Sequence, residues 1–83
     1  MQLTILTPEK KIYQGEAEGV KLPGIDGSFE ILNHHAPIIA ALAEGDVRIN
    51  TGSAAKHITI QSGFVEVLGN KTTVLVEGAK AAE

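Results

Sequence analysis

Short runs of alternating apolar and polar residues, each soon followed by glycine or proline, run through the whole sequence. Val47 and Ile49 alternate with polar residues, and so do Ile58 and Ile60. A period of two places every second side chain on the same face, which is typical of a half-buried strand. Val, Ile and Thr supply 6, 9 and 6 residues, or 21 of 83, and their branched side chains favour pleated sheets. The pattern predicts an all-β fold.

The positions of the turn residues predict where the strands begin and end. The predicted strands cover residues 3–6, 11–14, 16–22, 28–32, 38–42, 47–50, 57–61, 64–68 and 72–76. Residues 23–27 and 33–37 read as loops, Gly15 and Ser62-Gly63 as strand ends, and Gly69-Asn70 as a tight hairpin turn. The apolar run 38–42 fits one helical turn or a buried strand, and its β-rich surroundings favour the strand. Residues 78–83 are helix formers, too few for a helix alone.

Turns at spacings of about ten residues predict a single flattened β-sandwich or barrel of about eight to ten short strands. With 83 residues, the chain has room for one domain, covering 1–83. The predicted core combines the apolar residues of the alternating runs. These are Ile5, Val20, Phe29, Ile31, Val47, Ile49, Ile58, Ile60, Val65, Val67, Val74 and Val76. Some of them could instead face a partner, because a docking sheet needs an apolar patch of its own.

Composition excludes several classes of function. The net charge of −3 provides no basic field for nucleic acid, and the absence of cysteine removes disulfides and thiolate metal sites. No apolar run approaches the ~20 residues of a membrane-spanning helix. The first residues, Met1 to Thr4, have no signal-peptide character. A reducing, cytoplasmic compartment is therefore expected.

Candidates for chemistry are few. His34 and His35 are the best metal or acid–base residues, but neighbours in an extended segment point to opposite sides, and His57 is distant in sequence. No phosphate-binding glycine loop or nucleophile elbow is present. We therefore predict no catalytic residue, nucleotide site, metal site or cofactor. From the residues alone the chain is a small binding or structural module, with a histidine–carboxylate enzyme as the remaining alternative.

Several blocks of residues, in order and at characteristic spacings, resemble the epsilon subunit of F-type ATP synthases. The blocks are L-T-I-L-T-P-E-K at 3–10, G-E at 15–16, L-P-G-x-x-G-x-F at 22–29, I-L-x-x-H-A-P-I-I-A-A-L at 31–42, G-x-V-R-I at 45–49, G-F-V-E-V at 63–67 and N-x-x-T-V-L at 70–75. Together they cover nearly the whole chain. The resemblance implies the family's amino-terminal domain, a flattened β-sandwich, which agrees with the fold predicted from the residues.

The resemblance also implies a role and partners. The family's subunit belongs to the rotating central stalk, where it performs no bond chemistry, binds the gamma subunit and rests on the c-subunit ring. It helps to couple ion flow to ATP synthesis in the alpha and beta subunits, as a peripheral component at the cytoplasmic face of the inner (cell) membrane. A free-standing β-sandwich adaptor for another protein is the alternative.

Matching positions suggest contact residues for each partner. The expected gamma-contact residues are His35, Pro37 and, as a weaker candidate close to His35, Thr7. The expected ring-contact residues are Asp26, Gly27, Ser28 and Glu30. A structural role for His35, hydrogen-bonding within its own loop, is the alternative to gamma contact.

The chain departs from the family's pattern at a few positions. Asn33 stands where the family usually has proline, His34 where it has asparagine or glycine, and Glu30 where it commonly has glycine. The sequence also ends where the family's two-helix carboxy-terminal domain would begin. We expect a short subunit or a truncated one, unable to inhibit ATP hydrolysis through an extended helical hairpin.

Overall fold

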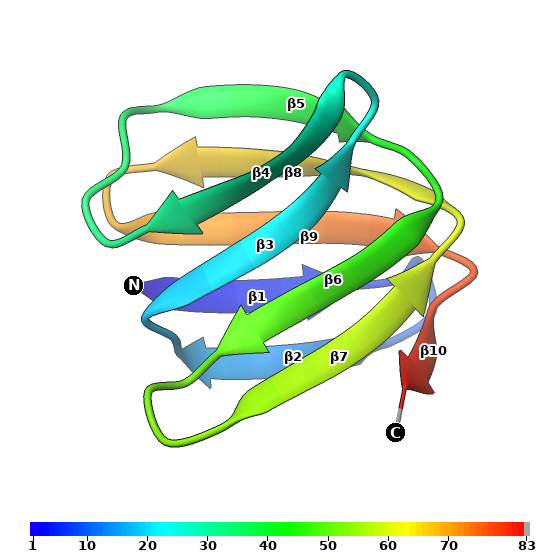
Figure 1. Ribbon diagram of the computed structural model, residues 1–83, viewed down its shortest axis with the longest axis horizontal. Coiled ribbons are helices and arrows are strands. Elements are labelled where there is room, and N and C mark those ends of the chain that lie inside the picture. Colours follow the sequence, from blue (N-terminus) through cyan, green and yellow to red (C-terminus); the bar gives the residue numbers. More distant parts are fainter. Residues whose placement is uncertain (83) are drawn as a thin grey trace.

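The protein, represented by a computed structural model that describes residues 1–82, is built from strands (Figure 1). The strands are β1 (Gln2–Leu6), β2 (Lys11–Glu16), β3 (Gly19–Gly24), β4 (Gly27–Leu32), β5 (Ile38–Leu42), β6 (Gly45–Asn50), β7 (Ala55–Ile60), β8 (Ser62–Leu68), β9 (Lys71–Glu77) and β10 (Lys80–Ala82). Within the described residues no segment forms a helix, so none that could cross a membrane is found there. The predicted all-β class and number of strands are confirmed.

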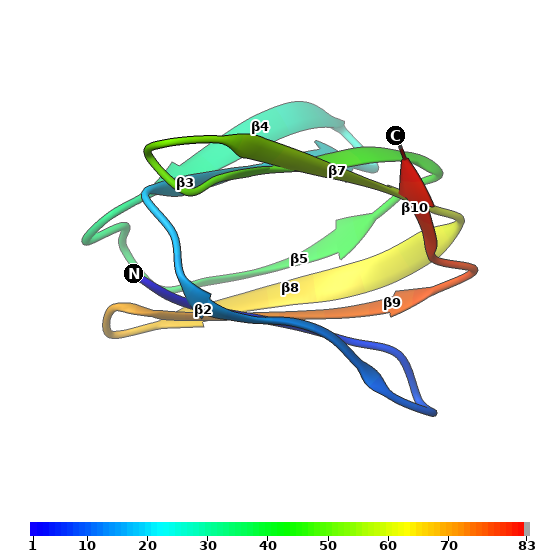
Figure 2. The same cartoon turned by 90° about the horizontal axis from the view of Figure 1, so that it is seen from below.

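All the strands belong to one curled sheet that folds into two layers (Figure 2). One layer contains β4, β3, β6, β7 and β10, and the other contains β5, β8, β9, β1 and β2. In the pairing of the described strands, the layers are joined at one corner, where Gly24 of β3 pairs with Leu42 of β5. Ile25 N donates to Ala41 O at 3.2 Å and Ala43 N donates to Pro23 O at 2.7 Å at this corner. The result is the flattened sandwich that the sequence predicts.

The core lies between the two layers and consists of the inward-facing residue of each alternating pair. All the predicted core residues are buried except Phe29, which is half-buried and packs against the edge of the core. Leu3, Leu22 and Leu42 complete it. The alternative that some of these residues face a partner does not hold for eleven of the twelve, which point inward and lie at 6% exposure or less.

Several glycines that were predicted to lie in a loop or at strand ends lie within strands. Gly15 lies inside β2, Gly24 and Gly27 form the last pair of the β3–β4 hairpin, and Ser62-Gly63 begin β8. Glycine weakens a strand but is accepted where a neighbouring backbone comes close. An ideal Cβ on Gly63 would lie 2.4 Å from the carbonyl oxygen of Leu75. Here glycine marks close packing and not a turn.

Other local predictions are confirmed. Gly69-Asn70 joins β8 to β9 as a two-residue hairpin turn, with Gly69 at a φ of 63°. The ambiguous run 38–42 is a strand. In the tail, Lys80–Ala82 pairs with β7 as a strand and so takes β structure despite its helix-forming residues. Glu83 lies outside the described residues.

The first and last long strands are held together by a parallel pairing. Residues of β1 pair with those of β9, from Gln2 opposite Lys71 to Leu6 opposite Leu75. The amino group of Met1 donates to Ala17 O at 2.8 Å and to Oδ1 of Asn33. These contacts place β1 between β9 and β2, with Leu3 and Ile5 in the core.

Candidate binding surfaces

The layer of β5, β8 and β9 carries apolar side chains on its solvent side. Ile39 is 76% exposed and Phe64 59%. We define the outer apolar face by four exposed residues: Ile39, Phe64, Leu68 and Leu75. Large apolar side chains gathered on one sheet face characterise sites of protein–protein contact, whereas single ones are common on any surface.

Strand register brings these side chains onto one surface, where Glu66, which pairs with Ile39 on β5 and Thr73 on β9, lies between Phe64 and Leu68. Phe64 stands between Ala41 on β5 and Leu75 on β9, and Leu75 in turn pairs with Leu6 on β1. Directly opposite residues have Cβ atoms about 4.5–5.5 Å apart, so their side chains touch. A hollow of about 350 Å³ lies between Phe64, Ile39 and Leu75, and one of about 260 Å³ lies on the other side of Phe64. Phe64 thus forms a ridge between two shallow apolar hollows.

The loop containing His34, His35 and Pro37 borders one end of this face. His34 N donates to Oδ1 of Asn70 at 2.9 Å, which ties the loop to the β8–β9 turn. The half-buried His35 has Nδ1 2.7 Å from the carbonyl oxygen of Ala36, which fits an N–H donor at Nδ1. This bond matches the structural reading of His35. Pro37 is exposed and leads directly into β5.

Thr7 does not lie close to His35, so that part of the prediction is wrong. β1 and β9 run parallel, and both β9 and β5 are antiparallel to β8, so β5 and β1 run in the same direction. Through Leu75 and Phe64, Leu6 of β1 is level with Ala41 of β5. His35 precedes β5 and Thr7 follows β1, so they lie at opposite ends of the sheet, separated by about seven residues or roughly 23 Å of strand. Figure 1 shows β1 and β5 running in the same direction. Thr7 Oγ1 caps its own turn by accepting from Lys10 N at 3.0 Å.

The β3–β4 hairpin holds the second group of predicted contact residues. Asp26, Gly27 and Ser28 are exposed at its tip. Glu30, also exposed, lies further along β4, opposite Lys21. The hairpin protrudes at the corner where β3 meets β5. Three of the four residues therefore form one tip, and Glu30 lies on the outer surface behind it.

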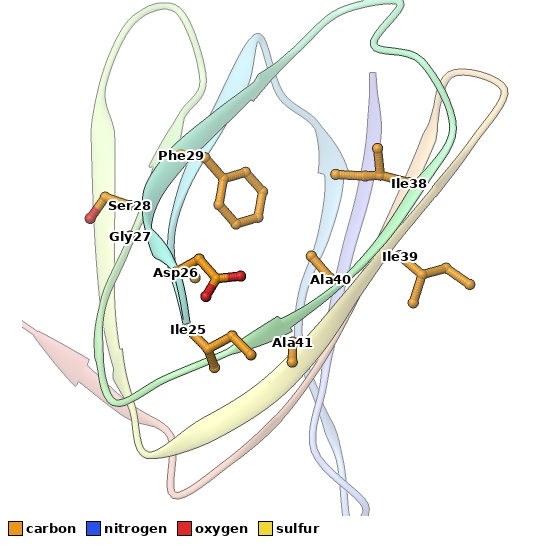
Figure 3. A pocket seen from close by; sticks show the side chains of 10 residues that line it. Ile25, Asp26, Gly27, Ser28, Phe29, Ile38, Ile39, Ala40 and Ala41 are labelled. Atoms are coloured by element: carbon orange, nitrogen blue, oxygen red, sulfur yellow. The ribbon is translucent and has the colours of Figure 1, made fainter.

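A groove of about 600 Å³ separates this hairpin from β5. Figure 3 shows the Phe29 ring and the Asp26 carboxylate pointing from the hairpin toward β5, whereas Ser28 and Ile39 point away from the groove. The lining is mainly apolar, with Ile38 and Ala40 on the β5 side. In the pairing of the described strands, β4 bonds only to β3, so its other edge is open along this groove.

The opposite outer surface, on β3, β6 and β7, is polar. In register, Lys21 faces Arg48 and Arg48 faces His57. His57 Nδ1 lies 2.8 Å from Oδ2 of Asp46, with side chains 42% and 50% exposed. The pair is open to water, and catalytic pairs gain their strength in sites that exclude water. Across residues 1–82 no three His, Asp or Glu side chains gather closely enough to hold a metal ion.

Sequence reasoning missed the outer apolar face as a site. One signal for it was available, because the alternation in 64–68 places Phe64 and Leu68 on the face opposite to Val65 and Val67. The sequence pattern places Val65 and Val67 in the core, but the opposite face of 64–68 was not treated as a binding surface. Burial identifies that face as the outer one, since Val65 is fully buried.

An all-β sandwich with one apolar and one polar outer surface has the properties of a protein-binding domain. Residues 1–82 match the family model described as ATP synthase, Delta/Epsilon chain, beta-sandwich domain. The chain therefore belongs to this family, as its resemblance predicts.

Relatives and solved structures agree with this assignment. The ATP synthase epsilon chain of Chlorobium limicola is 43% identical over 77 residues, covering 92% of this chain and 88% of that protein. That of Symbiobacterium thermophilum is 42% identical over 84 residues, covering 100% of this chain and 60% of that protein. The chain spans about 61% of several others, including that of Salinibacter ruber at 38% identity and 99% coverage of this chain.

Two solved structures share the fold at low sequence identity. A chain of the Euglena gracilis mitochondrial ATP synthase (OSCP/F1/c-ring, rotational state 1) superposes with a TM-score of 0.89 at 18% identity, over 95% of this chain and 51% of that chain. A chain of the Tetrahymena thermophila mitochondrial ATP synthase central stalk and c-ring gives a TM-score of 0.83 at 17% identity, over 95% and 64%.

Proposed function

We propose that this chain is the β-sandwich domain of a central-stalk subunit of an F-type ATP synthase. In this role it binds the gamma subunit and the c-ring and helps to couple ion translocation to ATP synthesis. It performs no bond chemistry and meets the alpha and beta subunits only indirectly. It is peripheral to the membrane, at its cytoplasmic face. The family match over residues 1–82 carries this proposal.

The outer apolar face is the gamma-binding surface in this proposal. A sheet face with Ile39 and Phe64 more than half exposed gains free energy when a partner covers it, about 25 cal/mol per Å² of apolar surface. His35 and Pro37 border one end of the face, and Thr7 follows Leu6 at the other end. A partner that spans the face can therefore reach both ends, although the two sites are not adjacent.

The hairpin tip is the ring-binding site in this proposal. Asp26, Gly27 and Ser28 are exposed beside Ile25, which is 63% exposed. A neighbouring loop can therefore approach the backbone at Gly27 and cover the Ile25 side chain. The tip lies at the end of the sandwich opposite to His35, beyond the corner of β3 and β5. Two partners can therefore bind without competing for the same residues.

The test is binding of the 83-residue chain to purified gamma subunit, followed by addition of purified c-ring in detergent. Saturable binding to gamma and then to the ring supports the proposal. A folded chain that binds neither partner refutes it and leaves the free-standing adaptor as the better reading. An enzyme activity of the isolated chain would also contradict it.

Charge reversal at the hairpin should weaken the ring contact selectively. We expect Glu30→Lys to lower ring affinity about tenfold or more, because like or misplaced charge at an interface costs on the order of 1–3 kcal/mol. Affinity for gamma should not change. Glu18→Lys, an exposed charge reversal outside the hairpin, is the matched control. Equal loss in both variants would mean that the effect is only one of net charge.

His35→Ala separates the two readings of His35. Loss of its bond to the Ala36 carbonyl should lower the free energy of unfolding by about 1 kcal/mol. We also expect weaker gamma binding at a temperature where the variant remains folded. Urea unfolding followed by far-UV circular dichroism measures the first effect, and calorimetric titration with gamma measures the second. Unchanged gamma affinity in the folded variant would assign His35 a structural role alone.

A further inference from the structure

Asp26 and Gly27 form an aspartyl–glycine step at the tip of the β3–β4 hairpin. Asp26 is exposed, and no heavy atom lies within 4 Å of the place where a Cβ of Gly27 would stand. No side chain from elsewhere in the fold therefore crowds Gly27, and glycine has no side chain of its own. Such steric access is required if the backbone nitrogen of Gly27 is to attack Cγ of the Asp26 side chain.

The hairpin turn at this step is not of the type that best fits two-residue loops. Gly24 pairs with Gly27, leaving Ile25 and Asp26 as the loop residues. Favoured turns have a positive φ at the first or at both central residues, which matches the twist of the strands. Among residues 1–82, His34 is the one non-glycine residue with a positive φ, so neither Ile25 nor Asp26 has one. In this hairpin the positive φ belongs to Gly27, at 123°. The backbone freedom of the step thus lies at glycine.

We propose that Asp26 is a site of spontaneous isomerisation to isoaspartate. The backbone nitrogen of Gly27 attacks Cγ of the protonated Asp26 carboxyl group. The N–Cγ bond forms, a Cγ–O bond breaks, and the oxygen leaves as water with the amide proton and the carboxyl proton, closing a succinimide ring. Water then opens the ring. Cleavage of the N–Cγ bond restores aspartate, whereas cleavage of the bond from nitrogen to the backbone carbonyl carbon leaves isoaspartate.

Isomerisation changes the hairpin without changing its mass. The main chain now passes through Cβ and Cγ of residue 26, which adds one methylene to the loop, and the free carboxylate is that of the former backbone carbonyl. The added atom disturbs the Gly24–Gly27 pair that closes the hairpin. The carboxylate thus created is the chemical group on which a repair methyltransferase of the isoaspartyl class would act.

The second aspartate of the chain is a natural internal control. Asp46 lies within β6, where it is paired with Thr59, and its carboxylate accepts from His57 at 2.8 Å. The residue after it, Val47, is fully buried, and its β-branched side chain crowds the nitrogen that would have to attack. We therefore expect Asp46 to remain unmodified where Asp26 isomerises.

Trypsin cleaves after Lys and Arg, so residues 22–48 form one peptide that contains both aspartates. The folded chain is incubated for several weeks at neutral pH and physiological temperature and then digested. Fragment ions specific for isoaspartate report each position separately. We expect the isomer to accumulate at residue 26 and to stay at background at residue 46. The same incubation in urea gives the rate for the unfolded chain.

Asp26→Glu is the matched variant, because it keeps the charge but would require a larger, slowly forming ring. Circular dichroism checks that it folds, and the isomer signal at residue 26 should be lost. Equal isomer content at residues 26 and 46 would overturn the proposal. Accumulation at residue 26 in urea but not in the folded chain would overturn it too. None of these readouts depends on gamma or on the ring, so the result stands apart from the proposed function.

Discussion

Gly63→Ala is expected to lower the free energy of unfolding by about 3 kcal/mol, and Gly63→Val to prevent folding. An added Cβ would lie 2.4 Å from the carbonyl oxygen of Leu75 and 3.1 Å from Cα of Val76. These are backbone atoms, so no side-chain rotation relieves the clash. β8 is also fixed on its other side, where Gly63 pairs with Leu42. Relief would require separating β8 from β9 in the middle of a layer.

The expected loss is large relative to the total free energy of unfolding, which is about 4–12 kcal/mol for a domain of this size. Urea unfolding followed by far-UV circular dichroism measures it, as the chain has no tryptophan. Gly69→Ala is the control: nothing lies within 4 Å of its Cβ, but its φ is 63°, which should cost about 1–2 kcal/mol. A Gly63→Ala variant less affected than Gly69→Ala would show that the two strands can separate easily.

Gly63 also illustrates how far the sequence predicts this fold. Alternation identified the strands and their buried faces, because a period of two depends only on neighbouring residues. The hairpin at Gly69-Asn70 was predicted for the same local reason. Glycine, however, serves both turns and close packing, and only the tertiary structure distinguishes the two. Gly15, Gly24 and Gly63 were therefore assigned to strand ends or loops although they lie within strands.

Long-range pairings were beyond the reach of the sequence. The parallel pairing of β1 with β9 joins residues about seventy positions apart, and the sandwich corner rests on the single pair of Gly24 and Leu42. No local pattern encodes either contact. The same limit explains the error with Thr7: its distance from His35 depends on the relative directions of β1 and β5, which are set through β8 and β9.

The candidate surfaces were predicted unevenly. The residues of the hairpin tip were proposed from the family's motif, and the structure brings Asp26, Gly27 and Ser28 together at one exposed place. Their contact with the ring stays a prediction. The outer apolar face required burial to be known, since Phe64 and Val65 are adjacent apolar residues on opposite faces of β8. Hydrophobicity alone cannot tell a core residue from a docking residue.

Phe64→Glu is expected to abolish binding to the gamma subunit while leaving the domain folded. Phe64 is the aromatic member of the outer apolar face and stands between Ala41 and Leu75, and buried aromatic residues carry about 2–4 kcal/mol in many interfaces. Phe64→Ala should therefore weaken binding by about 30-fold or more. The glutamate adds the cost of covering a charge with apolar surface. Calorimetric titration with purified gamma measures both variants.

The control introduces the same carboxylate on the other outer surface. Lys21→Glu places it on β3, where Lys21 is exposed and faces Arg48, so gamma affinity should stay within about twofold of the unmodified chain, as for exposed changes outside an interface. Because Phe64 is 59% exposed, Phe64→Ala should change unfolding stability by about 0.5 kcal/mol or less. If the Lys21→Glu variant no longer binds gamma and the Phe64→Glu variant still does, gamma binds the polar surface. The outer apolar face must then serve another contact.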